Sequence, residues 1–292
     1  MRNTFINSLI NCADKTDIVL IVGDLGFSVI EPFQKKFPNL FINAGVAEQN
    51  MMGLAAGLAS EGVRPFVYSI ANFPTFRCAE QVRNDVAYHN LPVVIVSVGG
   101  GLSYGNMGYS HHAVQDFSLM RSMPNMRIFA PGDPVELVKG FDKLIEYDGP
   151  TYLRLGRGGE DNIHSSINSS IYPGTILKVV DKQSSRLVLS TGASLKYAVS
   201  ENHTFFEKDY DVASMPIWGM DLKQEAYNSL KLYSEIIVIE DHLVDGGFGS
   251  WILESFNQFS ENNTSIKLLG LDPKVTNMVG DQDYLNKVGW SL

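Results

Sequence analysis

Runs of consecutive apolar residues alternate, over the first half of the chain, with stretches in which apolar residues recur at helical spacing. Runs such as DIVLIV (17–22) and PVVIVSV (92–98) are typical of strands that are buried on both faces. The alternation predicts a parallel sheet covered by helices. The expected strands are 17–22, 40–43, 64–69, 92–98, 127–130 and 151–155, and the expected helices are 47–59, 76–89, 114–121 and 134–147.

The pattern breaks at GRGGEDNIHSSINSSIYPG (156–174), which is rich in Gly, Ser and Asn and has no periodicity, as in an interdomain connection. Apolar runs then return at 186–191, 210–215, 235–240 and 265–270. We therefore expect an α/β fold of two domains, each a mostly parallel sheet sandwiched by helices. The expected divisions are a first domain at 1–160, a linker at 161–175 and a second domain at 176–292.

Composition narrows the class of protein. A chain of 292 residues with 45% hydrophobic residues is large enough for two domains with real cores. The net charge of −9 argues against nucleic acid or an anionic membrane as the main partner. No apolar run is long enough to cross a bilayer, and the N-terminus lacks the apolar region of a signal peptide. Two cysteines are too few for a disulfide framework, so we expect a cytoplasmic protein.

One carboxylate stands out in NAGVAEQNMMGLAAGLASEG (43–62). This stretch contains the expected helix 47–59 and has little side-chain bulk. Its glycines weaken the helix by about 1 kcal/mol each, which indicates close packing, as against another subunit. Glu48 lies in the first turn, where the helix dipole stabilises an anion, and a partly hydrated helix-start residue is the more ordinary interpretation. The alternative is a buried carboxylate that exchanges a proton with a ring nitrogen.

The same stretch resembles the pyrimidine-binding segment of transketolases and 1-deoxyxylulose-5-phosphate synthases. Similar segments follow in the family's order and cover essentially the whole chain: PFVYSIANFPTFRCAEQVRNDVAYHNLPVVIV, MGYSHHAVQDFSLMRSMPNMRIFAPGDPVE, TYLRLGRGG, STGASL, ASMPIWGMD and VIEDHLVDGGFGS. The chain thus resembles the C-terminal half of a split transketolase, with a pyrimidine-binding domain and the family's C-terminal domain. The resemblance implies a transferase that moves a two-carbon ketol unit between sugars with thiamine diphosphate as cofactor.

The resemblance also implies roles for particular residues. Glu48 matches the glutamate that hydrogen-bonds N1′ of the aminopyrimidine, and Phe73 matches the aromatic residue that stacks on that ring. Phe76 is either a wall of the cofactor site or a core residue. His111 matches a histidine that hydrogen-bonds a substrate oxygen and suits acid–base chemistry, with His112 secondary. Arg157 lies where transketolases bind a substrate phosphate, for which a guanidinium fork is suited.

The family's metal motif, Gly-Asp-Gly followed by a distant Asn, does not appear, and GDLG (23–26) lies at a different place. The resemblance therefore implies that an N-terminal, diphosphate-binding partner subunit supplies the ligands for Mg²⁺ or Ca²⁺. It also implies an α2β2 assembly with the active site at the interface. Asp24 is interpreted either as a structural loop residue or as a contact to the cofactor region or the interface, and both remain open.

Two departures from the family put the usual donor in question. Gly99 stands where transketolases carry histidine, and Met107 where they carry aspartate. We expect both positions, with Ser28, to face the substrate, and the loss of polar partners changes which sugars are bound. The donor is then a ketose phosphate, a modified or nucleotide-linked sugar, or a small 2-oxo acid. Arg154 and the cluster of Glu240, Asp241 and His242 are expected to be structural.

Three other functions compete with ketol transfer. A synthase of this type would decarboxylate a 2-oxo acid and add the acyl unit to a sugar, so released carbon dioxide separates the two reactions. The β subunit of a 2-oxo acid dehydrogenase fits the segment SHHAVQDFSLMRSMPNM (110–126) less well. A non-catalytic partner that scaffolds or regulates an enzyme subunit is a hypothesis of another class, and it would tolerate replacement of Glu48.

Overall fold

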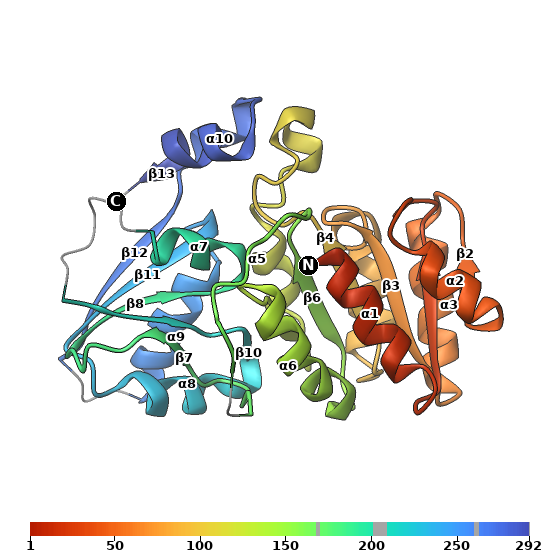
Figure 1. The fold of residues 1–292 in the computed structure, drawn as a ribbon, viewed down its shortest axis with the longest axis horizontal. Helices are drawn as coiled ribbons and strands as arrows, with labels where there is room; N and C mark the ends of the chain where they lie inside the picture. Colours follow the sequence, from red (N-terminus) through yellow and green to blue (C-terminus); the bar gives the residue numbers. More distant parts are fainter. Residues whose placement is uncertain (168–169, 201–208, 260–262, 292) are drawn as a thin grey trace.

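Figure 1 shows the computed structural model, which describes residues 1–167, 170–200, 209–259 and 263–291 as two sheets side by side. The first sheet has the strand order β10-β5-β6-β4-β3-β1-β2 and is parallel except for β10. Its strands are β1 (Ile18–Val22), β2 (Phe41–Asn43), β3 (Arg64–Ile70), β4 (Val94–Val98), β5 (Arg127–Phe129), β6 (Thr151–Leu155) and β10 (Ile217–Gly219).

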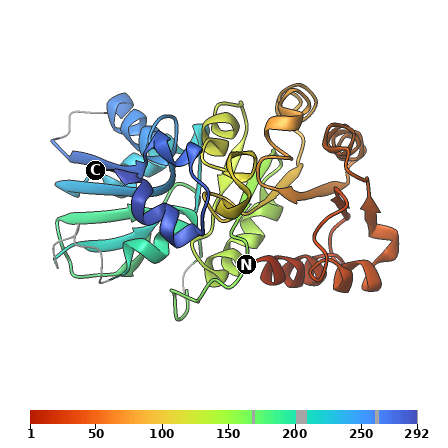
Figure 2. The ribbon, with the colours of Figure 1, turned by 90° about the horizontal axis from the view of Figure 1, so that it is seen from above.

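Helices cover both faces of this sheet, and Figure 2 shows α1 on one side and α3 on the other. The α-helices are α1 (Arg2–Cys12), α2 (Glu31–Lys36), α3 (Glu48–Ser60), α4 (Ala79–Gln81), α5 (Asp116–Arg121) and α6 (Pro134–Glu146). Short 3₁₀ turns are η1 (Pro38–Leu40), η2 (Phe76–Cys78), η4 (Gly105–Met107) and η5 (Tyr109–His111), and η3 (Val82–Ala87) is a π-helix.

The second sheet has the order β13-β12-β11-β8-β9-β7, with antiparallel strands only at its edges. Its strands are β7 (Leu177–Val180), β8 (Arg186–Ser190), β9 (Asp211–Ser214), β11 (Glu235–Leu243), β12 (Ser265–Leu271) and β13 (Trp290–Ser291). Its α-helices are α7 (Leu195–Ala198), α8 (Lys223–Leu230), α9 (Phe248–Phe259) and α10 (Gln282–Gly289), with 3₁₀ turns η6 (Gly192–Ser194), η7 (Met220–Leu222) and η8 (Pro273–Asn277). No helix of the described residues is both long and apolar enough to cross a membrane.

The α/β class and the expected strands are confirmed, with ends that differ by at most three residues. The helix expected at 76–89 is wrong in type, because it passes from a 3₁₀ turn through one α-turn into the π-helix η3. A π-turn is wider than an α-turn, so positions four and five residues apart share a face. This puts Val82, Val86 and Ala87 into the core together. Helices α1 and α2 and the edge strands β7, β10 and β13 were not expected.

Strand β10 ties the two sheets together. It comes from the second half of the sequence, yet it pairs antiparallel with β5 at the edge of the first sheet. Its Trp218 is fully buried, with ring centroids 5.1 Å from Phe117 and 5.2 Å from Phe248. The Trp218 indole also donates to the Thr191 hydroxyl at 3.1 Å. Aromatic pairs at this spacing contribute beyond their buried area, so the junction of the sheets is a true core.

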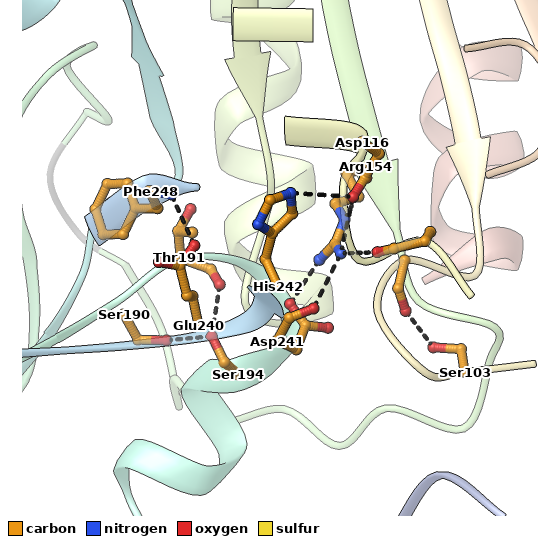
Figure 3. A network of polar contacts seen from close by, with 12 residues as sticks. Ser103, Asp116, Arg154, Ser190, Thr191, Ser194, Glu240, Asp241, His242 and Phe248 are labelled. Atoms are coloured by element: carbon orange, nitrogen blue, oxygen red, sulfur yellow. Dashed lines mark hydrogen bonds and ion pairs between the residues drawn. The ribbon is translucent and has the colours of Figure 1, made fainter. Parts of the chain in front are cut away.

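Beside this junction lies a buried ionic network, drawn in Figure 3. The Arg154 guanidinium, on β6, donates to the Asp116 carboxylate at 2.7 and 3.3 Å and to the Asp241 carboxylate at 2.6 Å. Its side chain is 2% exposed, and the two carboxylates are 0% and 1% exposed. Asp116 begins α5 and Asp241 lies on β11, so one cation joins both halves of the chain.

Two other polar residues of β11, Glu240 and His242, are kept mostly uncharged by burial. Burial raises the pKa of Glu240 to about 8, although the backbone N–H groups of Gly249 and Phe248, at the start of α9, donate to its carboxyl group. Burial lowers the pKa of His242 to about 4. Glu240 is then mostly protonated and His242 neutral at pH 7. Glu240 contacts the start of α9, and the His242 ring stacks on Phe117 with centroids 5.4 Å apart, so both buried side chains serve packing rather than a surface site.

We predict that Arg154→Ala lowers the free energy of unfolding by about 3–5 kcal/mol, because it leaves two buried carboxylates without their cation. Urea denaturation measures this. The control is Glu254→Gln, which breaks the exposed ion pairs of Glu254 with Arg121 and Lys223 and should cost about 0–1 kcal/mol. Equal losses in the two variants would contradict the role given to Arg154.

Candidate active site

The expected site residues gather at one edge of the first sheet, where its parallel strands end. Carboxyl ends of parallel strands meet at the same edge, and such edges are where α/β proteins bind ligands. Asp24 and Ser28 follow β1, Glu48 follows β2, Phe73 and Phe76 follow β3, Gly99, Met107 and His111 follow β4, and Arg157 follows β6. The topology thus brings residues from five strand ends into one region.

Glu48 is the first residue of α3 and is buried, with its side chain 4% exposed. The partner of its carboxylate is Arg77, whose Nη1 lies 3.4 and 3.3 Å from the two carboxylate oxygens. The Arg77 side chain is 51% exposed. The partly hydrated carboxylate suggested by the sequence is therefore not observed. Glu48 is instead a buried acid whose charged partner is half in solvent, where an ion pair is weak enough to give way to a ligand.

Arg77 also connects Glu48 to the aromatic residues of the site. Its Cζ lies 4.1 Å from the centroid of the Phe73 ring, a cation–π contact. The Phe73 ring in turn meets the His111 ring edge-on, with centroids 5.4 Å apart. The structure thus brings Glu48, Phe73 and His111 into one continuous group. Arg77 was not among the residues expected from the sequence, because an arginine near a phenylalanine gives no signal until the fold places it beside Glu48.

His111 lies in the short turn η5, where its Nδ1 is 3.0 Å from the Ser110 hydroxyl. Burial, then the charges of Arg77 and His112, lower the pKa of His111. It is therefore neutral at pH 7 and can both donate and accept a hydrogen bond. The Asn72 amide holds this turn by donating to the carbonyl oxygens of Ser110 and His112 at 3.2 and 2.9 Å.

The second half of the chain supports the loop that carries His111. At Gly105 an added Cβ would lie 2.4 Å from the Leu285 side chain of α10, which shows how closely the two segments pack. Figure 1 shows this loop, in yellow, beside α10. Arg154 also donates to the carbonyl oxygen of Ala113 at 2.8 Å, two residues after His111. The ionic network therefore fixes the end of the active-site loop as well as the junction of the sheets.

The other expected residues are less closely joined to Glu48. Asp24 accepts at 3.0 Å from the amide of Asn43, at the end of β2, and the Ser28 N–H donates to Glu31 at 2.8 Å, so neither contact joins these residues to Glu48. The side chains of Phe76 and Met107 are 47% and 58% exposed. Phe76 is thus not a core residue, and the alternative of a wall position remains a prediction.

Arg157 is exposed at the end of β6 and lines a cavity of about 610 Å³ with Arg2, Ser103, Asn106, Glu160 and Gln282. Two arginines thus line one cavity, together with the acidic residues Glu160 and Asp281, and a guanidinium fork suits an anionic group of a ligand. Arg157 also lies 5.2 Å from the centroid of the Tyr104 ring. The Tyr104 ring in turn is 6.2 Å from the ring of His111. The contacts therefore continue from Glu48 to Arg157 through Phe73, His111 and Tyr104.

Among the described residues, one group of three side chains could hold a metal ion: Asp133, Glu136 and His164. It lies after β5, and Asp133 is occupied in holding the chain together. Asp133 caps α6 by accepting from the Glu136 N–H, and it accepts the N–H groups of Ile163 and His164. Burial raises the pKa of Glu136 to about 7. These contacts fasten the connection 156–174 to the first sheet rather than face the site.

Comparison with known proteins defines the class. The family described as transketolase, pyrimidine binding domain, matches residues 6–159, so the strands of the first sheet other than β10, with their helices, form a pyrimidine-binding domain. The chain belongs to the transketolase family. It is 31% identical to one subunit of the apulose-4-phosphate transketolase of Actinobacillus succinogenes, over 98% of this chain and 91% of that subunit. It is thus similar, along its length, to one subunit of a two-part transketolase.

Two further comparisons agree. A solved structure described as split gene transketolase, inactive beta4 tetramer, superposes with a TM-score of 0.80 at 28% identity, covering 98% of this chain and 92% of that one. The 1-deoxy-D-xylulose-5-phosphate synthase of Clostridium perfringens is 30% identical over 98% of this chain but only 46% of that protein. The resemblance inferred from the sequence is confirmed: the chain belongs to the transketolase family and is similar along nearly its whole length to a split transketolase.

The family implies thiamine diphosphate as cofactor, and the described residues fit one end of it. A buried carboxylate at the start of α3, with an aromatic ring close by, suits an aminopyrimidine that offers a ring nitrogen and a flat face. Among the described residues, the group of Asp, Glu and His side chains that could hold a metal ion does not include Glu48. The described residues around Glu48 therefore suit the pyrimidine end of the cofactor.

We predict that Arg77→Gln raises the pKa of His111, because removing a nearby positive charge favours the protonated imidazole. Titration of the His111 ring by NMR measures this on the isolated chain. The control is Arg83→Gln, which removes an exposed arginine that bonds its neighbour Asn84. A pKa of His111 that does not move in Arg77→Gln would mean that the two side chains are not close in solution.

Proposed function

We propose that this chain is the C-terminal subunit of a two-component, thiamine diphosphate-dependent transketolase that transfers a two-carbon ketol unit between sugars. One observation carries the proposal: the buried Glu48 carboxylate, with Phe73 and His111 beside it, at the carboxyl edge of the pyrimidine-binding domain. When bound, the cofactor supplies a carbon nucleophile for the ketose carbonyl and an electron sink for the resulting carbanion.

Each residue of the chain has a task in this proposal. Glu48 accepts a hydrogen bond from the pyrimidine ring and exchanges a proton with its nitrogen, which requires Arg77 to move aside. Phe73 packs against the flat face of the pyrimidine. His111, neutral at pH 7, hydrogen-bonds the oxygen of the substrate carbonyl as the carbonyl is attacked. Support by α10 and Arg154 keeps His111 in place while the substrate binds.

We predict that Glu48→Gln lowers turnover of the assembled enzyme by about 10²-fold or more, because glutamine cannot exchange the proton. The reaction is followed with the partner subunit, thiamine diphosphate, Mg²⁺, a ketose phosphate and an aldehyde acceptor. The control is Glu61→Gln, at the exposed end of the same helix, which should keep activity. Full activity of Glu48→Gln with normal assembly would favour the hypothesis of a non-catalytic scaffold.

The residues at the substrate end of the site favour an anionic sugar as the donor. Arg157, with Arg2 in the same cavity, is suited to a phosphate or another anionic group at the end of the donor. The relative from A. succinogenes carries a branched sugar phosphate in its name, so a donor other than the usual ketose phosphates is included in the proposal. The assay therefore tests straight-chain and branched ketose phosphates together.

The partner is proposed to be an N-terminal transketolase subunit in an α2β2 assembly, which holds the diphosphate through Mg²⁺ or Ca²⁺. A docking face is available on α3, the helix that begins with Glu48. At Gly53 and Gly57 an added Cβ would meet no atom within 4 Å, although both lie inside the helix. Val46 and Leu54, on the same segment, are 71% and 37% exposed. This face lies next to the acid that must contact the cofactor, so the subunit that holds the diphosphate must approach here.

We predict that Gly57→Leu weakens association with the partner at least about tenfold, because added bulk at a packed interface costs about 1–3 kcal/mol. In the isolated chain the substitution should raise the free energy of unfolding by up to about 1 kcal/mol, since leucine favours the helix and the space is open. Calorimetric titration and urea denaturation measure the two effects.

The matched control is Lys139→Leu, which adds a leucine to the exposed side of α6, on the other face of the sheet. It should leave association with the partner unchanged. A Gly57→Leu chain that binds the partner as tightly as the unmodified chain would show that the α3 face is not the interface.

The second candidate is a synthase that decarboxylates a 2-oxo acid and adds the acyl unit to a sugar. It is supported by the 30% identity with 1-deoxy-D-xylulose-5-phosphate synthase along nearly the whole chain, although the chain spans about half of that protein. The two reactions share Glu48 and His111, so the site residues do not separate them. Carbon dioxide released from pyruvate by the assembled enzyme would favour the synthase, and its absence with active ketol transfer would favour the transketolase.

A further inference from the structure

Gly99 and Tyr104 fit together in a way that the sequence does not reveal. Gly99 follows β4 and has φ +86°, a conformation that favours glycine. A Cβ added there would lie 2.1 and 2.3 Å from Cε2 and Cδ2 of the Tyr104 ring. Since real Cβ atoms do not approach so closely, the Tyr104 ring fills the space that any side chain at position 99 would need. The side chain that is missing at Gly99 is therefore replaced by one from five residues further along.

The Tyr104 ring is held by a compact loop. The Ser103 hydroxyl donates to the Gly100 carbonyl oxygen at 2.7 Å, and the Met107 N–H donates to the Tyr104 carbonyl oxygen at 2.9 Å. The adjoining Gly105 packs tightly on Leu285 of α10. Because the backbone is fixed on both sides of Tyr104, the ring has little freedom to leave the space over Gly99. Tyr104 is half-buried, so part of the ring still faces outward.

The Tyr104 ring contacts both residues that would hold the ends of a sugar donor. Its centroid lies 6.2 Å from that of the His111 ring and 5.2 Å from Cζ of Arg157. A donor whose carbonyl is at His111 and whose anionic group is at Arg157 must pass along Tyr104. The face of an aromatic ring carries negative charge, so it attracts C–H hydrogens, but it gives a row of hydroxyl groups only weak partners in place of water.

We propose that Tyr104 is a specificity-determining residue, which replaces the polar side chain absent at Gly99 with an aromatic wall for the middle of the donor. The inference rests on the proposed ketol transfer. The donor class that fits is an anionic ketose that turns a C–H face, or a branched carbon, toward the ring. Donors that need a hydrogen bond at this position are bound less well, because their hydroxyl groups lose water and gain no partner.

The experiment compares donors in the assembled enzyme with the partner subunit, thiamine diphosphate and Mg²⁺. The probes are D-xylulose 5-phosphate, D-fructose 6-phosphate and the branched apulose 4-phosphate, and kcat and KM are measured separately for each. Tyr104→Leu keeps the bulk over Gly99 but removes the aromatic face, whereas Tyr104→Phe keeps the ring. Tyr109→Leu is the matched control, because it changes an exposed tyrosine of the same loop.

In Tyr104→Leu we expect the ratio of kcat/KM between the preferred and the poorest donor to fall about tenfold or more, mainly through KM. Tyr104→Phe and Tyr109→Leu should keep that ratio within about twofold, and all variants should bind thiamine diphosphate as the unmodified enzyme does. An unchanged ratio in Tyr104→Leu, or an equal change in Tyr109→Leu, would overturn the inference. Activity retained by Glu48→Gln would instead overturn the proposed function, so the two failures are distinguishable.

Discussion

The buried guanidinium of Arg154 is the constraint on which most of the structure depends. Isolated charges are costly inside a protein, so Asp116 and Asp241 can be buried only because one cation lies between them. Those two carboxylates belong to different halves of the chain, and the same cation binds the carbonyl oxygen next to the active-site loop. The junction of the sheets and the position of His111 therefore depend on the same cation. This explains why the site needs the second sheet, although that sheet contributes no catalytic group to it.

The candidate site offers side chains suited to the pyrimidine end of the cofactor and to the substrate, and it offers fewer for the diphosphate end. Glu48, Phe73 and His111 form a continuous group through Arg77, and Arg157 lies beyond Tyr104 in a cavity with a second arginine. Between them the chain offers a place for a pyrimidine ring, a carbonyl and an anionic group. The diphosphate and its metal need ligands of another kind, which is consistent with relatives that are named as one subunit of a two-part enzyme. The supply of those ligands by a second chain is part of the proposed function.

The sequence predicts the elements that depend on a local pattern of residues, but it does not predict contacts between segments that are distant along the chain. Continuous apolar runs indicated the parallel strands, and the resemblance pointed to Glu48 and His111 before any contact was known. The strand β10 could not be found in this way, because Ile217–Gly219 is short and its pairing with β5 spans the two halves. The pairing of Arg77 with Glu48 and the position of Tyr104 over Gly99 are likewise products of tertiary packing. Gly99 by itself looked like a lost contact, and only the fold shows which side chain fills its place.

The crossing of β10 also has a consequence for how the chain acquires its shape during synthesis. The ribosome releases the strands up to β6 well before Ile217–Gly219, so β5 must wait as an uncovered edge with unpaired backbone groups. An open edge is a template for pairing with other chains, and cells guard against it with chaperones or with rapid completion of the fold. The first domain therefore does not reach a fully protected state on its own, and its resistance to aggregation depends on residues of the second half of the chain, which emerge later.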